Sequence, residues 1–278
     1  MTSNTKTIER PEHTMTNTPM KAAMFGCGNM GQSLLSGWAD TDQIAFSVVD
    51  PALPNVGKHA VVLADAKDLP ETDWSIAIIA VKPQLIPMIM EQAGHVFKSA
   101  DLVLSIAAGV SMETLEKHVG DKQIIRMMPN MPASIGKGVS GLYGNDKCSD
   151  RDRDIVTDMA SRNGELVWVE TEDAIDRFTA IAGSGPGYVF EILRLYTIAA
   201  MEMGFDEDEA RKLVTQTVIG SAEMAAQSDK SLEDLRKSVT SKNGTTEAGL
   251  SKLMEGDKLK ELLSETVEAA YKRALELR

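Results

Sequence analysis

A glycine-rich turn between a strand and a helix is the feature that most constrains the fold of this chain. Residues 21–26 read as a short apolar strand, and the run Gly26–Gly31 (GCGNMG) follows at once. Apolar residues then recur at helical spacing. This setting predicts a dinucleotide site, because Gly26 makes the turn, Gly28 lets a pyrophosphate approach the backbone and Gly31 permits close helix packing.

The second predicted strand ends in an acidic residue. It runs from Ile44 to Val49 and is followed by Asp50, 19 residues after Gly31. A carboxylate at this place accepts hydrogen bonds from the adenosine ribose hydroxyls and repels a 2′-phosphate. The first cation after it is Lys58. The pattern favours NADH over NADPH, and the alternative is that Asp50 and its following proline only begin a turn.

Strands and helices alternate through the first half of the chain. Trp74–Val81, Leu102–Ala107 and Ile124–Met128 are apolar runs typical of strands buried on both faces, with helical segments between them. This order predicts an α/β N-terminal Rossmann-type domain, a doubly wound parallel sheet with helices on both faces. Val139–Tyr143 and Leu166–Val169 are expected to extend the sheet.

Ligands of such sheets bind outside the carboxyl ends of the strands. Several polar or glycine-containing segments follow predicted strands and should therefore meet at one edge: Gly26–Gly31, Val81–Pro83, Ala107–Gly109 and Met128–Pro132.

The second half of the chain reads as helices. Residues 183–188 (GSGPGY) break the pattern, and Ser184 is predicted to be the N-cap of the helix that follows. Apolar faces then recur up to the end of the chain. So many apolar faces favour burial against a second subunit, which predicts an all-α C-terminal dimerisation domain. The alternative is a compact monomeric bundle.

One stretch interrupts these helices. Residues 241–250 (SKNGTTEAGL) contain the turn dipeptide Asn243-Gly244, flanked by the hydroxyls of Ser241, Thr245 and Thr246. A helix N-terminus approached in this way suits an anion, because its first N–H groups lack partners and its dipole is positive there. The alternative is an ordinary loop in which Thr245 or Thr246 caps the next helix.

Composition argues against several classes of partner. The net charge of −12 argues against nucleic acid and anionic membranes. Two cysteines and four scattered histidines form no disulfide framework and no metal-ligand pattern, so no metal is expected. Residues 1–19 are polar without an apolar core, and no later segment is long enough to span a membrane. These features predict a disordered tail on a cytoplasmic protein.

From about Met20 onward, the chain resembles the pyrroline-5-carboxylate reductase family. The resemblance rests on the order and spacing of short motifs: GCGNMG at 26–31, AVKP at 80–83, SIAAGV at 105–110, RMMPNMPA at 126–133, GSGPGY at 183–188 and SKNGTTEAGL at 241–250. It implies a dinucleotide-binding Rossmann domain over residues 20–182. It also implies a helical substrate-binding and dimerisation domain over 183–278, interlocked into dimers that often form larger rings.

The resemblance also implies the chemistry and its residues. Hydride passes from NAD(P)H to the C=N carbon of 1-pyrroline-5-carboxylate, giving L-proline, and the cofactor performs the difficult step. The cofactor is expected to contact Gly26, Gly28, Asn29, Met30, Gly31, Asp50, Ala80, Val81, Lys82 and Asn130. For Lys82, a role of the backbone alone is an equal alternative.

The substrate half of the implied site is the turn at 241–246. Ser241 and the amides around Asn243, Gly244, Thr245 and Thr246 are expected to hold the substrate carboxylate. The hydroxyl of Thr246 matches the family position near the ring nitrogen, so Thr246 is expected to orient the substrate or relay a proton.

The chain departs from the family pattern at three places. Lys242-Asn243 stands where Pro-Gly is usual, Gly187 stands where alanine is usual, and Asp50 replaces the hydroxyl and basic residues typical of 2′-phosphate recognition. The last departure puts a preference for NADPH in doubt. Lys242 either adds a cation beside the substrate carboxylate or points into solvent.

Two rival functions remain open at this point. One is a reductase for a different imine or for a β-hydroxy acid. The hydroxy-acid enzymes place a catalytic lysine on the helix of the second domain, where this chain has Arg194 and no lysine. The other is a dinucleotide-binding regulator without turnover, against which the retained hydroxyls at 241, 245 and 246 argue.

Overall fold

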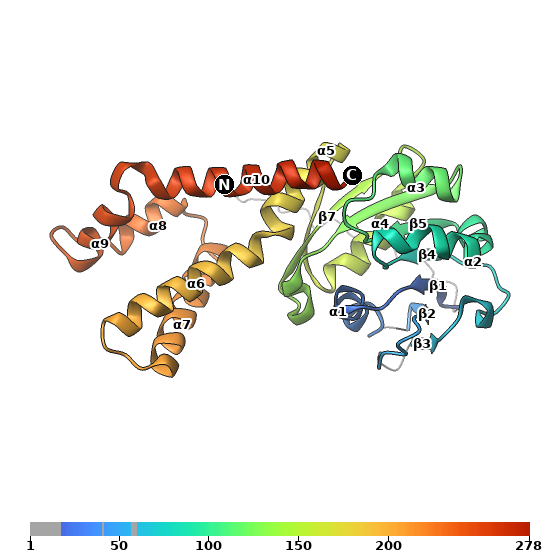
Figure 1. Ribbon diagram of the computed structural model, residues 1–278, viewed down its shortest axis with the longest axis horizontal. Coiled ribbons are helices and arrows are strands. Elements are labelled where there is room, and N and C mark those ends of the chain that lie inside the picture. Colours follow the sequence, from blue (N-terminus) through green and yellow to red (C-terminus); the bar gives the residue numbers. More distant parts are fainter. Residues whose placement is uncertain (1–17, 41, 57–59) are drawn as a thin grey trace, which may run out of the picture.

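The computed structural model describes residues 18–40, 42–56 and 60–278 of the chain. Nearly all of the tail expected at residues 1–19 lies outside the described residues. The described part consists of an α/β unit that contains the single large sheet and a helical arm that extends away from it (Figure 1).

The sheet has eight strands in the order β3-β2-β1-β4-β5-β6-β7-β8. All neighbouring pairs are parallel except β6 and β7, which run antiparallel. The order reverses between β1 and β4, as in other doubly wound dinucleotide-binding sheets. The predicted fold class is therefore confirmed. The strands are β1 Met20–Phe25, β2 Ile44–Val49, β3 Ala60–Leu63, β4 Ile76–Ile79, β5 Leu102–Ser105, β6 Gln123–Met128, β7 Gly138–Gly144 and β8 Gly164–Trp168.

Helices cover both faces of the sheet, and each face has its own apolar core. On one face α1 (Asn29–Trp38) and α4 (Asp150–Ser161) contribute to a cluster that takes Ala22 and Met24 from β1. On the other face α2 (Ile86–Ser99) and α3 (Met112–Val119) contribute to a cluster that takes Ala23 and Phe25. Successive residues of one strand thus enter opposite cores, which explains why the strand sequences are apolar throughout.

The edge strand β3 was not predicted. It is four residues long and only partly buried, so its sequence lacks the continuous apolar run of the central strands. The described part of the connection from β2, residues 50–56, contains turns and no helix. A crossover between parallel strands usually contains a helix. The described part of this connection has none, so the alternation of strand and helix that would predict a further strand is missing from the sequence.

The helical arm has few buried side chains. Within α6, α8 and α9 no residue is buried, and α6 alone exposes Phe190 at 63% and Leu195 at 51%. The predicted all-α C-terminal region is confirmed, and it leaves a broad apolar surface uncovered in one chain. α5 (Glu172–Phe178) leads into this region, whose helices are α6 Gly185–Glu202, α7 Glu207–Ala226, α8 Leu232–Ser238, α9 Thr245–Leu253 and α10 Lys258–Leu277.

The predicted break at residues 183–188 is reduced to a bend at Ser184, after which α6 begins with Pro186 in its first turn, and the predicted Ser184 side-chain cap is wrong. Thr179–Gly183 forms a π-helical turn that continues α5, and only Ser184 separates it from α6. Ser184 has helical dihedral angles and no capping hydrogen bond, and its N–H donates to the Thr179 carbonyl at 2.9 Å. The wider i→i+5 turn continues the helix across the glycines, so no free N-terminus exists there to be capped.

Candidate active site

The glycine turn and the end of β4 meet at the point where the strand order reverses. Gly26 has φ +90°, and a Cβ there would lie 2.6 Å from Val81 Cγ1 and 2.7 Å from the Ala80 carbonyl oxygen. The Ala80 N–H donates to the Phe25 carbonyl at 2.8 Å. Two segments that the sequence placed at the cofactor therefore lie in contact.

The start of α1 is open. Gly28 is its N-cap in an extended conformation, and a Cβ on Gly28 would meet no atom within 4 Å. This helix, all of which is described, has no acidic side chain in its first turn and no side-chain cap. Its first N–H groups and the positive end of its dipole therefore face space that a pyrophosphate can occupy.

The next residues of the turn fit the same arrangement. Asn29 and Met30 begin α1, with Asn29 exposed and Met30 packed partly against the core. A Cβ on Gly31 would lie 3.0 Å from Met24 Cε and 3.3 Å from the Gly26 carbonyl oxygen. Glycine at 31 thus lets the helix pack closely on β1.

The Asp50 carboxylate is bound to the glycine turn. Its Oδ2 accepts from the Cys27 N–H at 2.6 Å, and its Oδ1 accepts from the Ala52 N–H at 2.9 Å. Asp50 thus fixes the backbone of the turn in addition to placing a negative charge beside it, a structural role that the sequence did not indicate.

The thiol of Cys27 is buried beneath this contact. Burial, with a further contribution from the Asp50 charge, raises the pKa of the Cys27 thiol to about 11. The thiol therefore stays protonated near neutral pH, where a nucleophilic or metal-binding role would require the thiolate. Among the described residues no group of three or more His, Cys, Asp or Glu side chains is arranged to hold a metal ion.

The other predicted cofactor residues occupy different positions at the sheet edge. Lys82 is exposed and is the N-cap of a short 3₁₀ turn, in which its carbonyl accepts from the Leu85 N–H at 2.9 Å. Asn130 follows β6 and is buried; its Nδ2 donates to the Ala182 carbonyl at 3.1 Å and its Oδ1 accepts from the Val139 N–H at 2.9 Å. The Asn130 side chain thus joins the sheet edge to the π-helical turn.

The turn before α9 has a defined shape. The Gly244 N–H donates to the Ser241 carbonyl at 3.0 Å, and Asn243 has φ +56°. A Cβ on Gly244 would collide with Ser241 Oγ, so the serine hydroxyl lies directly against the N-cap of α9. Neither Thr245 nor Thr246 caps the helix, and both are exposed.

The cofactor and substrate halves are far apart within one chain. Figure 1 places α9 at one end of the long axis, whereas α1 and the sheet lie in the opposite half of the molecule. The structure therefore assembles the glycine turn, Asp50 and the end of β4 in one place, and leaves the 241–246 turn at a distance from them.

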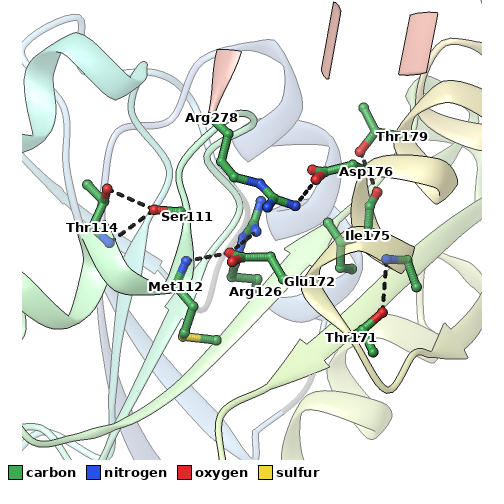
Figure 2. Close-up of polar contacts among 11 residues, drawn as sticks. Ser111, Met112, Thr114, Arg126, Thr171, Glu172, Ile175, Asp176, Thr179 and Arg278 are labelled. Carbon is green, nitrogen blue, oxygen red and sulfur yellow. Dashed lines mark hydrogen bonds and ion pairs between the residues drawn. The ribbon is translucent and has the colours of Figure 1, made fainter. Parts of the chain in front are cut away.

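A partly buried polar network, in which Arg126 and Asp176 are the buried members, fixes the base of the arm to the sheet (Figure 2). The Glu172 Oε1 atom accepts from Arg126 Nη1 and from the Met112 N–H, both at 2.5 Å. Asp176, one turn further along α5, pairs with Arg278. Burial lowers the pKa of the Arg126 guanidinium, and the Glu172 carboxylate opposes that shift. The partners are far apart in sequence, so no local pattern announced the network.

This network lies beside the carboxyl edge of the sheet, the edge at which ligands of doubly wound sheets generally bind. A Cβ on Gly109, which follows β5, would lie 2.9 Å from the Leu277 carbonyl oxygen. The end of α10 therefore rests against a loop that the sequence placed at the carboxyl edge of the sheet.

Among the described helices, none is long and apolar enough to cross a membrane.

Known proteins resemble the chain in sequence and in structure. The domain described as "Pyrroline-5-carboxylate reductase dimerisation" matches residues 172–277. A pyrroline-5-carboxylate reductase of Pseudomonas aeruginosa is 32% identical over 264 residues, which cover 92% of this chain and 96% of the relative.

Two solved structures share the architecture over nearly the full length. A pyrroline-5-carboxylate reductase from Coxiella burnetii aligns with a TM-score of 0.84 at 30% identity, covering 94% of this chain and 99% of the other. The pyrroline carboxylate reductase of Plasmodium falciparum with NADP bound aligns with a TM-score of 0.81 at 27% identity, with the same coverage. Because the Pseudomonas relative matches over nine-tenths of both chains, this chain belongs to the pyrroline-5-carboxylate reductase family.

Proposed function

We propose that this chain reduces 1-pyrroline-5-carboxylate to L-proline with a nicotinamide dinucleotide, the last step of proline biosynthesis. The observation that carries the proposal is the open N-terminus of α1 at the strand-order reversal, in a chain 32% identical to a pyrroline-5-carboxylate reductase over nearly its whole length. That site suits an anionic dinucleotide, and membership of the family indicates which substrate is reduced.

The dinucleotide, when bound, supplies the hydride that is added to the C=N carbon. The residues of the chain bind the dinucleotide and the substrate and orient them for the transfer. The amides that begin α1 hold the pyrophosphate, while Ala80, Val81 and Lys82 contact the cofactor from the end of β4. Asn130 acts here through the loop that it braces, since both ends of its amide already have protein partners.

The 241–246 turn holds the substrate. The Ser241 hydroxyl lies at the N-cap of α9, and the first amides of that helix lack a side-chain cap, which suits a carboxylate. Thr246 is exposed at the start of the helix, and its hydroxyl orients the imine nitrogen or passes a proton to it. This positioning is the main contribution that the protein makes to the rate.

The two halves of the site come from different chains. The separation of α9 from α1 along the molecule supports this arrangement. So do the uncovered apolar faces of the arm and the match of residues 172–277 to a dimerisation domain. We propose a dimer whose arms interlock. Each chain has a nucleotide domain at 20–182 and a helical domain at 183–278. We place the protein in the cytoplasm, where the free thiols of Cys27 and Cys148 stay reduced.

Turnover tests this function directly. Purified protein is mixed with 1-pyrroline-5-carboxylate and NADH or NADPH, and cofactor oxidation is followed by absorbance at the nicotinamide band. Substrate-dependent oxidation with proline as the product is expected. Folded protein that binds the dinucleotide but oxidises none of it with this substrate would instead support a regulator or a reductase for another substrate.

We further propose that NADH is preferred, because Asp50 places a negative charge where a 2′-phosphate would lie. Asp50→Asn is expected to raise kcat/KM for NADPH relative to NADH by about tenfold, since it removes the charge and keeps one oxygen for the Cys27 N–H while giving up the bond from the Ala52 N–H. Initial rates with both cofactors measure the ratio.

Asp50→Ser is the companion variant. It removes the charge and also the contact with Cys27, so both cofactors should bind more weakly while the ratio still shifts towards NADPH. The same ratio in the parent protein and in both variants would mean that the ribose is recognised by other residues.

A further inference from the structure

The turn that we assign to the substrate already contains a carboxylate of its own. Glu247, the third residue of α9, accepts a hydrogen bond from the Asn243 N–H at 2.6 Å. Asn243 is one of the residues whose amides are expected to bind the substrate carboxylate. The contact is not that of a capping box, because its donor is the Asn243 N–H, one residue before the Gly244 N-cap.

The contact is specific to the shape of this turn. The Gly244 N–H is taken by the Ser241 carbonyl, and Asn243 is held at φ +56°, which directs its N–H towards α9. Of the amides around the turn, that of Asn243 is therefore the one that Glu247 occupies. The Ser241 hydroxyl and the first amides of α9 are left for an incoming anion.

Two carboxylates at one short turn repel each other and compete for the same donor. One N–H forms one short hydrogen bond, so a substrate carboxylate that binds the Asn243 amide must displace Glu247. One that binds the remaining donors must lie close to the Glu247 charge. Either way, Glu247 weakens the binding of an anion, and more so for a dianion than for a monoanion.

We propose that Glu247 is a specificity-determining residue that acts as an internal competitor for the substrate carboxylate. It lowers the affinity of the turn for anions in general and selects ligands that carry a single carboxylate. The inference rests on the proposed role of the 241–246 turn. It does not require Glu247 to touch the reacting atoms.

Glu247→Gln separates the charge from the hydrogen bond. The glutamine oxygen still accepts from the Asn243 N–H, so the turn keeps its shape while the negative charge is removed. We expect KM for 1-pyrroline-5-carboxylate to fall by about three- to tenfold, with kcat within about twofold of the parent value. Acetate and malonate serve as mono- and dianionic inhibitors, and the Ki for malonate should fall more than that for acetate.

Glu255→Gln is the matched control. Glu255 is an exposed carboxylate just after the other end of α9, where it pairs with Lys252 at 3.4 Å. Its replacement changes the net charge of the protein equally and should leave KM and both Ki values unchanged.

The outcomes separate the inference from the function on which it rests. An unchanged or raised KM in Glu247→Gln, in protein that still turns over the substrate, overturns the inference and leaves Glu247 with only a structural contact to the Asn243 N–H. A lowered KM matched by Glu255→Gln also overturns it, because the effect is then one of net charge. Absence of turnover in the parent protein contradicts the proposed function itself.

Discussion

Gly26→Ala is expected to lower the free energy of unfolding by about 3 kcal/mol, whereas Gly28→Ala should change it by less than about 1 kcal/mol. Gly26 has φ +90°, and its Cβ would lie 2.6 Å from Val81 Cγ1, so alanine meets both backbone strain and a collision. Gly28 has an extended backbone, and its Cβ would meet no atom within 4 Å. Urea denaturation of the two variants measures the difference.

Among molecules that are folded, we expect Gly28→Ala to weaken cofactor binding more than Gly26→Ala does, which is the opposite of their order for stability. A methyl group on Gly28 fills the space into which the pyrophosphate must fit, so we expect the dinucleotide Kd of Gly28→Ala to rise by about 10- to 100-fold. Fluorescence titration with NADH and NADPH gives this value. If Gly28→Ala bound both dinucleotides as tightly as the parent protein, the pyrophosphate would not lie over this turn.

The second large effect is expected at the other end of the chain. Thr246→Ala should lower kcat by about 100-fold, because it removes the hydroxyl that we propose orients the imine nitrogen or relays its proton. Thr246 is exposed and makes no cap for α9, so its loss should leave the fold and the cofactor Kd unchanged. Steady-state rates and a cofactor titration on the same preparation check both parts.

Thr246→Ser is the control for this prediction. Serine keeps the hydroxyl and loses only a methyl group, so kcat should remain within a few-fold of the parent value. A kcat for Thr246→Ala equal to that of the parent protein would remove Thr246 from the mechanism. A rise in KM alone would make it a binding residue.

The sequence predicted the cofactor half well because its determinants are local. A strand, the glycine turn at 26–31 and a helix follow one another within about 20 residues, and each glycine has a separate steric reason. The apolar runs of the central strands likewise reflect burial on both faces of the sheet. Strand β3 was missed because it is short and half exposed.

The features that the sequence did not predict depend on contacts between distant residues or on unusual helix geometry. The π-helical turn at Thr179–Gly183 carries the chain through glycines that ordinarily end a helix. The pairs Arg126–Glu172 and Asp176–Arg278 join residues far apart in the chain, and so does the bond from Asn130 to the Ala182 carbonyl. The periodic spacing of apolar residues along a sequence does not predict contacts between such distant residues.

Within one chain, the cofactor turn and the 241–246 turn lie in opposite halves of the molecule. The uncovered apolar faces of the arm indicate that a second chain completes each site. Apolar side chains of α6 and α7, such as Phe190, Leu195 and Leu213, are exposed to a degree that a folded monomer seldom tolerates. We propose that burying them against a second copy brings the arm of one chain towards the nucleotide domain of its partner. The central claim is therefore that each active site joins the glycine turn of one chain to the 241–246 turn of another.

Subunit mixing tests this claim most directly. Gly28→Val, which blocks the pyrophosphate more fully than alanine, and Thr246→Ala each disable one half of the site and should self-associate normally by size-exclusion chromatography. After the two variants are dissociated, mixed in equal amounts and reassembled, half of the dimers contain one chain of each kind. Each such dimer then has one intact site, so turnover should return to about a quarter of the parent rate. A mixture that stays at the average of the two separate variants would show that both halves of the site come from the same chain.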